Sequence, residues 1–288
     1  MVRMKIAILS DIHSNDVALE ACINVIEREK VDYIIGLGDY VSDCPNPRNT
    51  LKLLTQLKER YETCFIRGNR EEYFLDYADG KIDNWTYSSY TGSLLYTYEH
   101  LAKEDLDWFG SMSNSTELIL PGVEPITLAH GSPFSTRELL DYEQDNTNHC
   151  LTNISTEYMI AGHTHRQMIY RYKQKILVNP GSVGVAIGVT KKAHMAVLEW
   201  REHRWHTRLL SVPFDYDLLK RKFLESRLMD KGNVWPRAIL KSMETGINYG
   251  PLCAKLAYDL AVEAHEVIEH RIVKEKYWIM AAKYYGVL

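Results

Sequence analysis

The strongest constraint on the fold is a strand–helix–strand pattern at the start of the chain. Residues 6–9 and 31–35 are apolar runs typical of buried strands, and the amphipathic segment 16–29 between them is typical of a helix. Strand, helix and strand within about thirty residues form a βαβ unit, which requires parallel strands and a right-handed crossover. A helix at 50–60 and a third strand at 63–66 extend the pattern. The chain therefore begins as an open α/β sheet.

Polar residues follow these strands where each strand ends. Asp11 and His13 follow the first strand, Asp39 follows the second, and Asn69 follows the third; the proline-containing segment 42–49 is expected to be a loop. Ligands of open α/β sheets bind beyond the carboxyl ends of the strands, so we expect these side chains to line one site. A carboxylate and an imidazole suit a divalent transition metal. An isolated Asp-x-His, however, is more often a hydrogen-bonded turn.

The second half of the chain is rich in strands. Short strands are expected at 116–120, 126–129 and 158–160, followed by consecutive strands at 167–171, 175–178, 193–200 and 204–210. His130 follows the strand at 126–129, while His163 and His165 follow the strand at 158–160. This half of the chain indicates a second sheet, so that the whole is expected to contain two sheets with helices outside them.

Two segments depart from the strand pattern. Aromatic residues make up 11% of the whole chain, and residues 71–112 contain a larger share of them. This segment is expected to form helices joined by loops. Most of these rings are expected in the core, with one or two left to stack on a flat substrate group. From residue 213 onward the pattern is helical, and 252–284 indicates a long helix or a helix pair. We expect a domain at 1–212 that contains the aromatic segment, and a helical extension at 213–288 packed on it.

Composition excludes several classes of protein. The net charge of −4 over 288 residues gives no basic footprint for a nucleic-acid backbone. The apolar run near the N-terminus is too short for a signal-peptide core, and no run approaches the length of a membrane span. The five cysteines lack metal-type spacing and are expected to be reduced thiols. These features predict a cytoplasmic protein that is not bound to a membrane.

The polar residues that follow the strands make one set of candidate metal ligands: Asp11, His13, Asp39, Asn69, His130, His163 and His165. Four imidazoles, two carboxylates and one amide suit two metals with mixed nitrogen and oxygen ligands, and one carboxylate must then bridge the metals. Two metals roughly 3.5–4 Å apart can hold a hydroxide between them and clamp an in-line displacement at phosphorus. The alternative is that these are isolated core or turn histidines. Any one of the five motifs alone would favour this alternative, but all five in this order, each at the end of a strand, do not.

Together these motifs resemble the signature of the calcineurin-like metallophosphoesterases. The matching blocks are Asp11-Ile12-His13, Gly38-Asp39, Gly68-Asn69-Arg70-Glu71, His130-Gly131 and Gly162-His163-Thr164-His165. The segment 179–183, Asn-Pro-Gly-Ser-Val, further resembles the YfcE-like phosphodiesterase branch. The resemblance implies a metal-dependent phosphoesterase with a four-layer αββα sandwich, in which two mixed β-sheets are flanked by helices.

The resemblance also implies roles for individual residues. The first metal would be held by Asp11, His13, Asp39 and His165, and the second by Asp39, Asn69, His130 and His163. Catalysis would involve Asp39, Asn69, Arg70 and His130. The cofactors implied are two divalent transition metals, manganese first, with iron, nickel, cobalt or zinc as alternatives.

Arg70 departs from the family pattern. Many members carry a histidine at this place, where it contacts the scissile phosphate and can protonate the leaving group. An arginine does not donate a proton at neutral pH, but it can bind phosphate through two hydrogen bonds. Arg70 therefore favours substrates with good leaving groups, such as phosphoanhydrides or activated aryl diesters. A surface ion pair of Arg70 with Glu71 or Glu72 is the alternative.

The expected activity is hydrolysis of a small phosphodiester or nucleotide. The aromatic segment and the near-neutral charge favour a ligand of nucleotide size, with dinucleoside polyphosphates and cyclic nucleotides as candidates. A phosphomonoesterase or protein phosphatase is the alternative among enzymes, and a non-catalytic scaffold of the same fold is the alternative outside them. The C-terminal helices could hold a partner or a second copy of the chain in a homo-oligomer.

Overall fold

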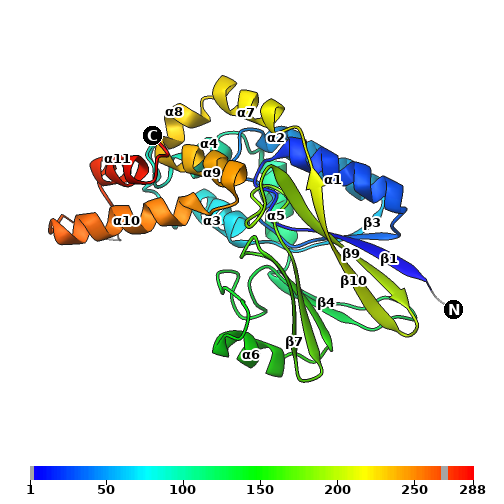
Figure 1. The fold of residues 1–288 in the computed structure, drawn as a ribbon. Helices are drawn as coiled ribbons and strands as arrows, with labels where there is room; N and C mark the ends of the chain where they lie inside the picture. Colours follow the sequence, from blue (N-terminus) through cyan, green and yellow to red (C-terminus); the bar gives the residue numbers. More distant parts are fainter. Residues whose placement is uncertain (1–2, 267–271) are drawn as a thin grey trace.

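The computed structural model describes residues 3–266 and 272–288 and contains two five-stranded mixed sheets flanked by helices (Figure 1). The first sheet has the order β10-β9-β1-β2-β3 and consists of β1 (Met4–Leu9), β2 (Tyr33–Gly36), β3 (Glu62–Phe65), β9 (Lys192–Arg201) and β10 (Arg204–Pro213). The second has the order β4-β5-β6-β8-β7 and consists of β4 (Ser115–Leu118), β5 (Ile126–Ala129), β6 (Tyr158–Ala161), β7 (Gln167–Tyr172) and β8 (Lys175–Pro180). The predicted fold is confirmed.

The register of the strands places their carboxyl ends side by side. β1 pairs with β2 in parallel, Leu9 opposite Gly36, and β2 pairs with β3 in parallel, Gly36 opposite Phe65. In the second sheet β5 and β6 are parallel, and Ala129 lies opposite Ala161. The polar loops after β1 and β2 therefore start at one level of the first sheet, and those after β5 and β6 start at one level of the second.

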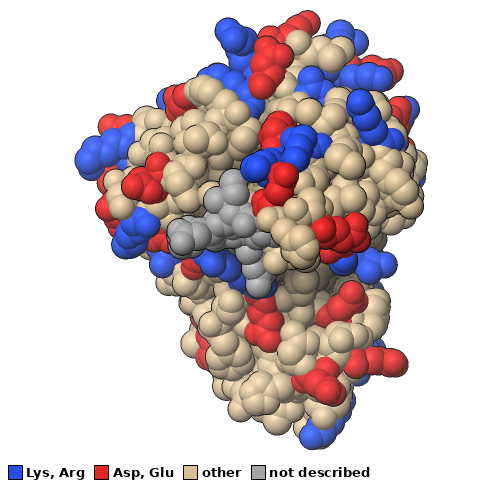
Figure 2. Space-filling view, turned by 90° about the vertical axis from the view of Figure 1, so that its left-hand side faces the viewer, with Lys and Arg blue, Asp and Glu red and all other residues tan. Residues whose placement is uncertain are grey.

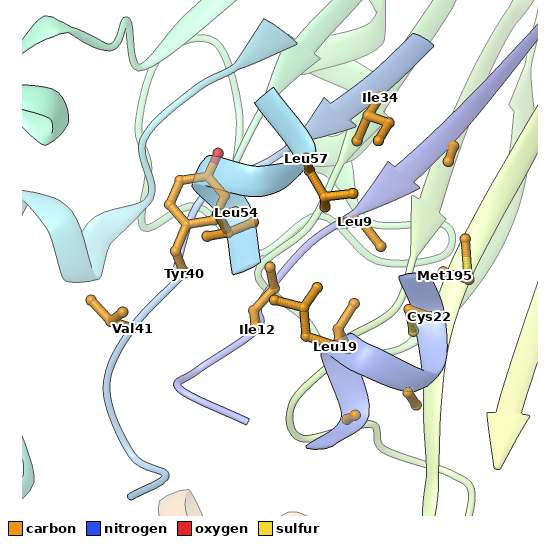
Figure 3. Packing of buried hydrophobic residues seen from close by; sticks show 14 of the residues in the cluster. Leu9, Ile12, Leu19, Cys22, Ile34, Tyr40, Val41, Leu54, Leu57 and Met195 are labelled. Atoms are coloured by element: carbon orange, nitrogen blue, oxygen red, sulfur yellow. The ribbon is translucent and has the colours of Figure 1, made fainter. Parts of the chain in front are cut away.

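The alternation of side chains along β1 builds two layers of core. Ile6 and Ile8 pack with Ile160 and Val178 of the second sheet. The next residues in the strand point to the opposite face, where Leu9 packs against α1 (Asp16–Glu29) and α2 (Pro47–Arg60) (Figure 3). The outer face of the second sheet is covered by α6 (Asp145–Thr152). The layers are thus helix, sheet, sheet and helix.

Two helices begin earlier than the sequence pattern indicated. α2 starts at Pro47, inside the segment predicted as a loop, because proline suits the first turn of a helix, where its missing N–H is not needed. Asn69 and Arg70 lie in the first turn of α3 (Asn69–Ala78) and not in a loop. The third polar site of the first sheet is therefore a helix N-terminus.

The aromatic segment forms helices joined by loops, as predicted. Its helices are α3, α4 (Gly92–Tyr98) and α5 (Lys103–Ser111). Phe74, Trp85, Tyr96 and Phe109 are buried, and four further rings pack against the core, namely Tyr73, Tyr77, Tyr98 and Trp108. Most of the rings therefore have a core role.

The C-terminal segment is mainly helical in its described part. Its helices are α7 (Tyr216–Glu225), α8 (Leu228–Gly232), α9 (Val234–Thr245), α10 (Tyr249–Glu263) and α11 (Glu275–Tyr284), and they gather with α3 and α4 on one side of the molecule (Figure 1). Residues 252–284 thus contain a helix pair, with 267–271 outside the described residues. The division of the chain between residues 212 and 213 stays a prediction. Within the described residues, no helix has the length and apolar character needed to cross a membrane.

Candidate metal centre

All seven predicted metal ligands lie together where the strands end. Asp11 and His13 follow β1, Asp39 follows β2, Asn69 begins α3, His130 follows β5, and His163 and His165 follow β6. Their side chains form two groups, Asp11 with His13 and His165, and Asp39 with His130 and His163, in each of which the ligand atoms lie within 4.8 Å of one another. Asn69 joins the second group, with its Oδ1 3.1 Å from Nε2 of His130.

The backbone at these residues is strained. Asp11, His13, Asp39, His163 and His165 all have φ between 50° and 66°, in the left-handed region that residues with a Cβ rarely adopt. Such conformations persist only where the surrounding structure enforces them, and they cluster at functional sites. Five of the seven candidate ligands therefore carry such strain.

A glycine lets two of the loops approach each other. Gly38 has φ 93°, and a Cβ added to it would lie 2.2 Å from the backbone nitrogen of Gly68. Any side chain at position 38 would push the Asp39 loop away from the start of α3. A glycine is thus required before Asp39 because the two ligand loops pass too close to each other for a side chain at position 38.

The first group has the spacing of ligand atoms around one ion. Nε2 of His13 lies 3.0 Å from Nε2 of His165, which is 3.2 Å from Oδ1 of Asp11. These separations suit atoms about 2.0–2.2 Å from a shared metal. Oδ2 of Asp11 accepts hydrogen bonds from the Ser10 hydroxyl at 2.5 Å and the His163 N–H at 3.0 Å. Oδ1 is buried and has no hydrogen-bond donor among the described residues, as expected of an oxygen reserved for a cation.

Asp39 lies between the two groups. Its Oδ2 is 3.8 Å from Nε2 of His13, and its Oδ1 is 3.5 Å from Nε2 of His130. Oδ1 also accepts the backbone N–H of Arg70 at 2.8 Å. One carboxylate therefore faces a histidine of each group, which is the position that a bridging ligand needs.

Three of the histidines are oriented through their other ring nitrogen. Nδ1 of His130 lies 2.7 Å from the carbonyl oxygen of Leu37, and Nδ1 of His165 lies 2.9 Å from that of Val185. A carbonyl only accepts, so each Nδ1 carries the proton and leaves the Nε2 lone pair for a metal. In His13, Nδ1 is 3.1 Å from the Ser42 hydroxyl.

The electrostatics of the cluster favour bound cations. Burial lowers the pKa of His13 to about 4 and that of His163 to about 4, so both rings are neutral at pH 7 and able to coordinate. Burial would lower the pKa of His165 too, but the Asp11 carboxylate raises it above its usual range. Burial opposes ionisation of Asp11, yet His165 and His130 hold its pKa well below the usual range. The Asp11 carboxylate is thus ionised although it is buried.

The segment 179–183 braces the ligand loops. The Asn179 side chain donates to the carbonyl of Gly162 at 2.6 Å, and the Ser182 hydroxyl donates to the carbonyl of Asp11 at 2.7 Å. The N–H of Val183 donates to Ser10 at 2.9 Å. This loop holds the Asp11 and His163 turns together without supplying a ligand.

Glu71 supports the site in a way that the sequence pattern did not reveal. Its buried carboxylate accepts the backbone N–H groups of Gly68, Asp39 and Tyr40, each at 2.8 Å. Burial and the nearby Asp39 raise the pKa of Glu71 to about 7. Its place three residues after Gly68, where a helix begins, is the sequence signal that could have indicated this role.

Arg70 pairs with neither Glu71 nor Glu72, so the ion-pair alternative drawn from the sequence is wrong. Its Nη2 lies 3.0 Å from Oδ2 of Asp43, and its Nε lies 3.9 Å from Oδ2 of Asp39. Glu71 turns back to the helix N-terminus instead, and Glu72 accepts from a threonine hydroxyl. Arg70 therefore lies directly beside the metal-ligand groups.

Asp43 is a further residue of the site that the sequence pattern did not single out. It is buried, its Oδ2 is 3.3 Å from Nδ1 of His13, and its Oδ1 accepts the indole N–H of Trp235 at 2.9 Å. Burial alone would raise the pKa of Asp43, but Arg70 and His13 hold it below its usual range. Asp43 therefore connects a candidate metal-ligand histidine to helix α9.

Comparison with known proteins gives consistent matches. A family model described as a calcineurin-like phosphoesterase superfamily domain matches residues 4–203. An uncharacterized protein of Methanocaldococcus jannaschii is 26% identical over 249 residues, 79% of this chain and 95% of that protein. The crystal structure of a hypothetical protein of Pyrococcus horikoshii matches with a TM-score of 0.69 and 18% identity, over 84% of this chain and 98% of that one. A metallophosphoesterase of Sphaerobacter thermophilus matches with a TM-score of 0.65 and 21% identity, over 85% of this chain and 100% of that one.

Proposed function

We propose, on the premise that this chain belongs to the calcineurin-like phosphoesterase superfamily, that it hydrolyses small phosphodiesters or nucleotides at a dinuclear metal centre. The family model covers most of the chain, so the family predicted from the five sequence blocks is confirmed, and with it a metal-dependent phosphoesterase. The observation that carries the dinuclear proposal is the pair of ligand groups on either side of Asp39.

The donor set fits two divalent transition metals. Asp11, His13 and His165 would hold one ion, Asn69, His130 and His163 would hold the other, and Asp39 would contact both. When bound, the metals neutralise the phosphate and supply a nucleophile from water near neutral pH. We propose manganese as the native metal, with iron, nickel, cobalt or zinc as alternatives, since imidazole and carboxylate ligands suit this series.

Arg70 is proposed to bind the phosphate. Its side chain is only 17% exposed, and its Nε is buried without an acceptor among the described residues, beside the Asp39 carboxylate. A guanidinium stays charged at all working pH values, so the leaving group must take its proton from water. This supports substrates that release a stable anion, such as dinucleoside polyphosphates, ahead of unactivated alkyl esters. Cyclic nucleotides are the second candidate.

The alternatives differ in what they require of the site. A phosphomonoesterase or protein phosphatase would use the same ligand groups on another substrate. A non-catalytic scaffold has no need of seven ligands in place, and the retention of all of them supports an enzyme.

Location and assembly are also proposals. Figure 2 shows basic and acidic side chains interspersed on the face turned towards the viewer, without a continuous basic stretch. Together with the net charge of −4, this mixed surface supports a small substrate rather than a long nucleic acid. We propose that the protein is cytoplasmic.

Exposed apolar side chains on the C-terminal helices, among them Val262, Met280 and Tyr284, support a homo-oligomer formed through these helices.

The test combines metal analysis with a substrate screen. Protein reconstituted with manganese should hold about two metals per chain and hydrolyse bis(p-nitrophenyl) phosphate, and the screen then compares kcat/KM for dinucleoside polyphosphates, cyclic nucleotides and phosphomonoesters. Asp39→Asn should abolish turnover, because the bridging carboxylate is lost. Asp107→Asn, an exposed change of the same kind, is the control. Retention of turnover within tenfold in Asp39→Asn would exclude the dinuclear proposal, and less than one metal per chain without turnover would favour the scaffold.

A further inference from the structure

A cavity of about 790 Å³ lies beside the candidate metal centre. One wall comes from the segment around α3 and α4, including Tyr73, Trp85 and Tyr90, and the opposite wall comes from the C-terminal helices, including Trp235, Ala254 and Trp278. Its volume lies in the range of sites that enclose a small ligand. Two segments that are distant in sequence therefore enclose one space.

The inner end of the cavity reaches the metal-ligand groups. Asp43 and Arg70 both line it. Asp43 lies 3.3 Å from His13, and Arg70 lies 3.9 Å from Asp39. A phosphate held between the ligand groups would therefore have its ester substituent next to the inner end of this cavity.

The walls carry aromatic rings and groups that can hydrogen-bond. Trp278 packs against Trp235, with ring centroids 6.4 Å apart. The lining also includes Asn84, whose exposed side-chain amide can both donate and accept hydrogen bonds.

A cation lies at the exposed side of the same cavity. The exposed guanidinium of Arg137 lies over the ring of Tyr73, 4.9 Å from its centroid, and forms no ion pair with any of the residues the structure describes. A flat ring surface, an exposed amide and an unpaired guanidinium together suit a base, a sugar and a second phosphate. These are the parts of a nucleotide.

We propose that this cavity binds the nucleoside part of a nucleotide substrate, and that helices α9, α10 and α11 thereby form part of the active site. The proposal rests on the proposed function, since it names the substrate class of that site. Aromatic stacking and the depth of the cavity then select nucleotides over simple phosphate esters. The C-terminal helices are accordingly a specificity element.

The experiment compares binding of adenosine 5′-monophosphate and of inorganic phosphate to the manganese-loaded full chain by calorimetry. The nucleotide should bind at least tenfold more tightly than phosphate. Ala254→Trp, which fills the cavity from α10, should remove that preference. Val262→Trp, at an exposed position of the same helix outside the cavity, should keep it. Equal affinities for the two ligands, or a preference unchanged by Ala254→Trp, would overturn the proposal.

A second variant guards against misfolding of Ala254→Trp. Tyr90 is about half exposed and lines the cavity, so Tyr90→Ala removes a stacking surface without opening the core. It should weaken the nucleotide about tenfold while circular dichroism and the unfolding temperature stay unchanged. Unaltered nucleotide affinity in a folded Tyr90→Ala protein would count against the cavity as the base site.

Hydrolysis of bis(p-nitrophenyl) phosphate, measured on the same protein, separates this proposal from the proposed function. Turnover of the diester without preferential nucleotide binding would support the phosphoesterase function and exclude the nucleoside site. Preferential nucleotide binding that depends on Ala254, in a protein without turnover, would keep the cavity and remove the enzymatic function.

Discussion

Trp235 donates its indole N–H to Oδ1 of Asp43 at 2.9 Å, and the other oxygen of Asp43 faces Nδ1 of His13 at 3.3 Å. A helix of the C-terminal segment thus contacts a candidate metal ligand through one buried carboxylate. Partners of this kind fix the ring orientation of a metal-ligating histidine and raise its basicity. The C-terminal helices are therefore expected to affect metal binding as well as the cavity.

The first prediction concerns this hydrogen bond. Trp235→Phe keeps an aromatic ring and removes the N–H, which leaves Asp43 with one donor fewer. Metal affinity should fall about 10–100-fold, the usual cost of losing such an outer contact. A titration with manganese against a competing chelator measures it. Trp205→Phe, which removes the indole N–H that Trp205 of β10 donates to the carbonyl of Glu124, is the matched control and should bind metal normally, because Trp205 lies near the start of β1 and Asp11 follows its end. Equal metal affinity in both variants would show that α9 does not position His13.

The second prediction concerns Glu71, which accepts three backbone N–H groups of the ligand loops. Glu71→Gln replaces one acceptor oxygen by an amide NH₂ that must face a donor. The free energy of unfolding should fall by about 1–3 kcal/mol, and metal affinity should fall with it. Urea unfolding of the metal-free protein gives the first value. Glu72→Gln, whose side chain accepts from Thr136, should change stability little because the amide oxygen can still accept.

That the seven candidate ligands lie together could be predicted because each follows a strand in a short local motif. Recognising where β1 and β2 end is enough to select Asp11, His13 and Asp39. The parallel register of the two strands then brings these residues together. The bond between Asp43 and Trp235 could not be predicted, since it joins residues 192 positions apart through packing of α9. The ion pair of Arg70 with Asp43 could not be predicted either, because it also joins residues that are distant in sequence. The two glutamates beside Arg70 in sequence bind other groups, at the start of α3 and on Thr136.

The third prediction concerns His194, a buried histidine of β9 outside the metal centre. Burial lowers its pKa to about 4, with Lys192 adding to the effect, and its Nδ1 has no partner among the described residues. In the unfolded chain its pKa is about 6.5, so between these values the unfolded state binds more protons. Its contribution to stability is complete above pH 6.5 and is lost as the pH falls towards 4.

Urea unfolding of the metal-free protein at pH 7 and pH 5 tests this sign. His194→Gln should lose less stability over that interval than the native chain, by about 1–2 kcal/mol. The other histidines titrate in both proteins and cancel in the difference. His203→Gln, at an exposed position, should behave as the native chain does. A native chain that becomes more stable at pH 5 relative to His194→Gln would show that His194 is protonated in the fold.

The last prediction concerns the choice of leaving group. Arg70 lies beside Asp39 and Asp43 but cannot supply a proton, so alkyl esters should react far more slowly than p-nitrophenyl esters. Arg70→His introduces a group that can donate one. The ratio of kcat/KM for an alkyl nitrophenyl diester to that for a dialkyl diester should fall by about tenfold or more, within the range of general acid catalysis. Arg70→Lys keeps the charge without a usable acid and should leave the ratio high. A ratio that is the same in all three proteins would mean that departure of the leaving group does not depend on position 70.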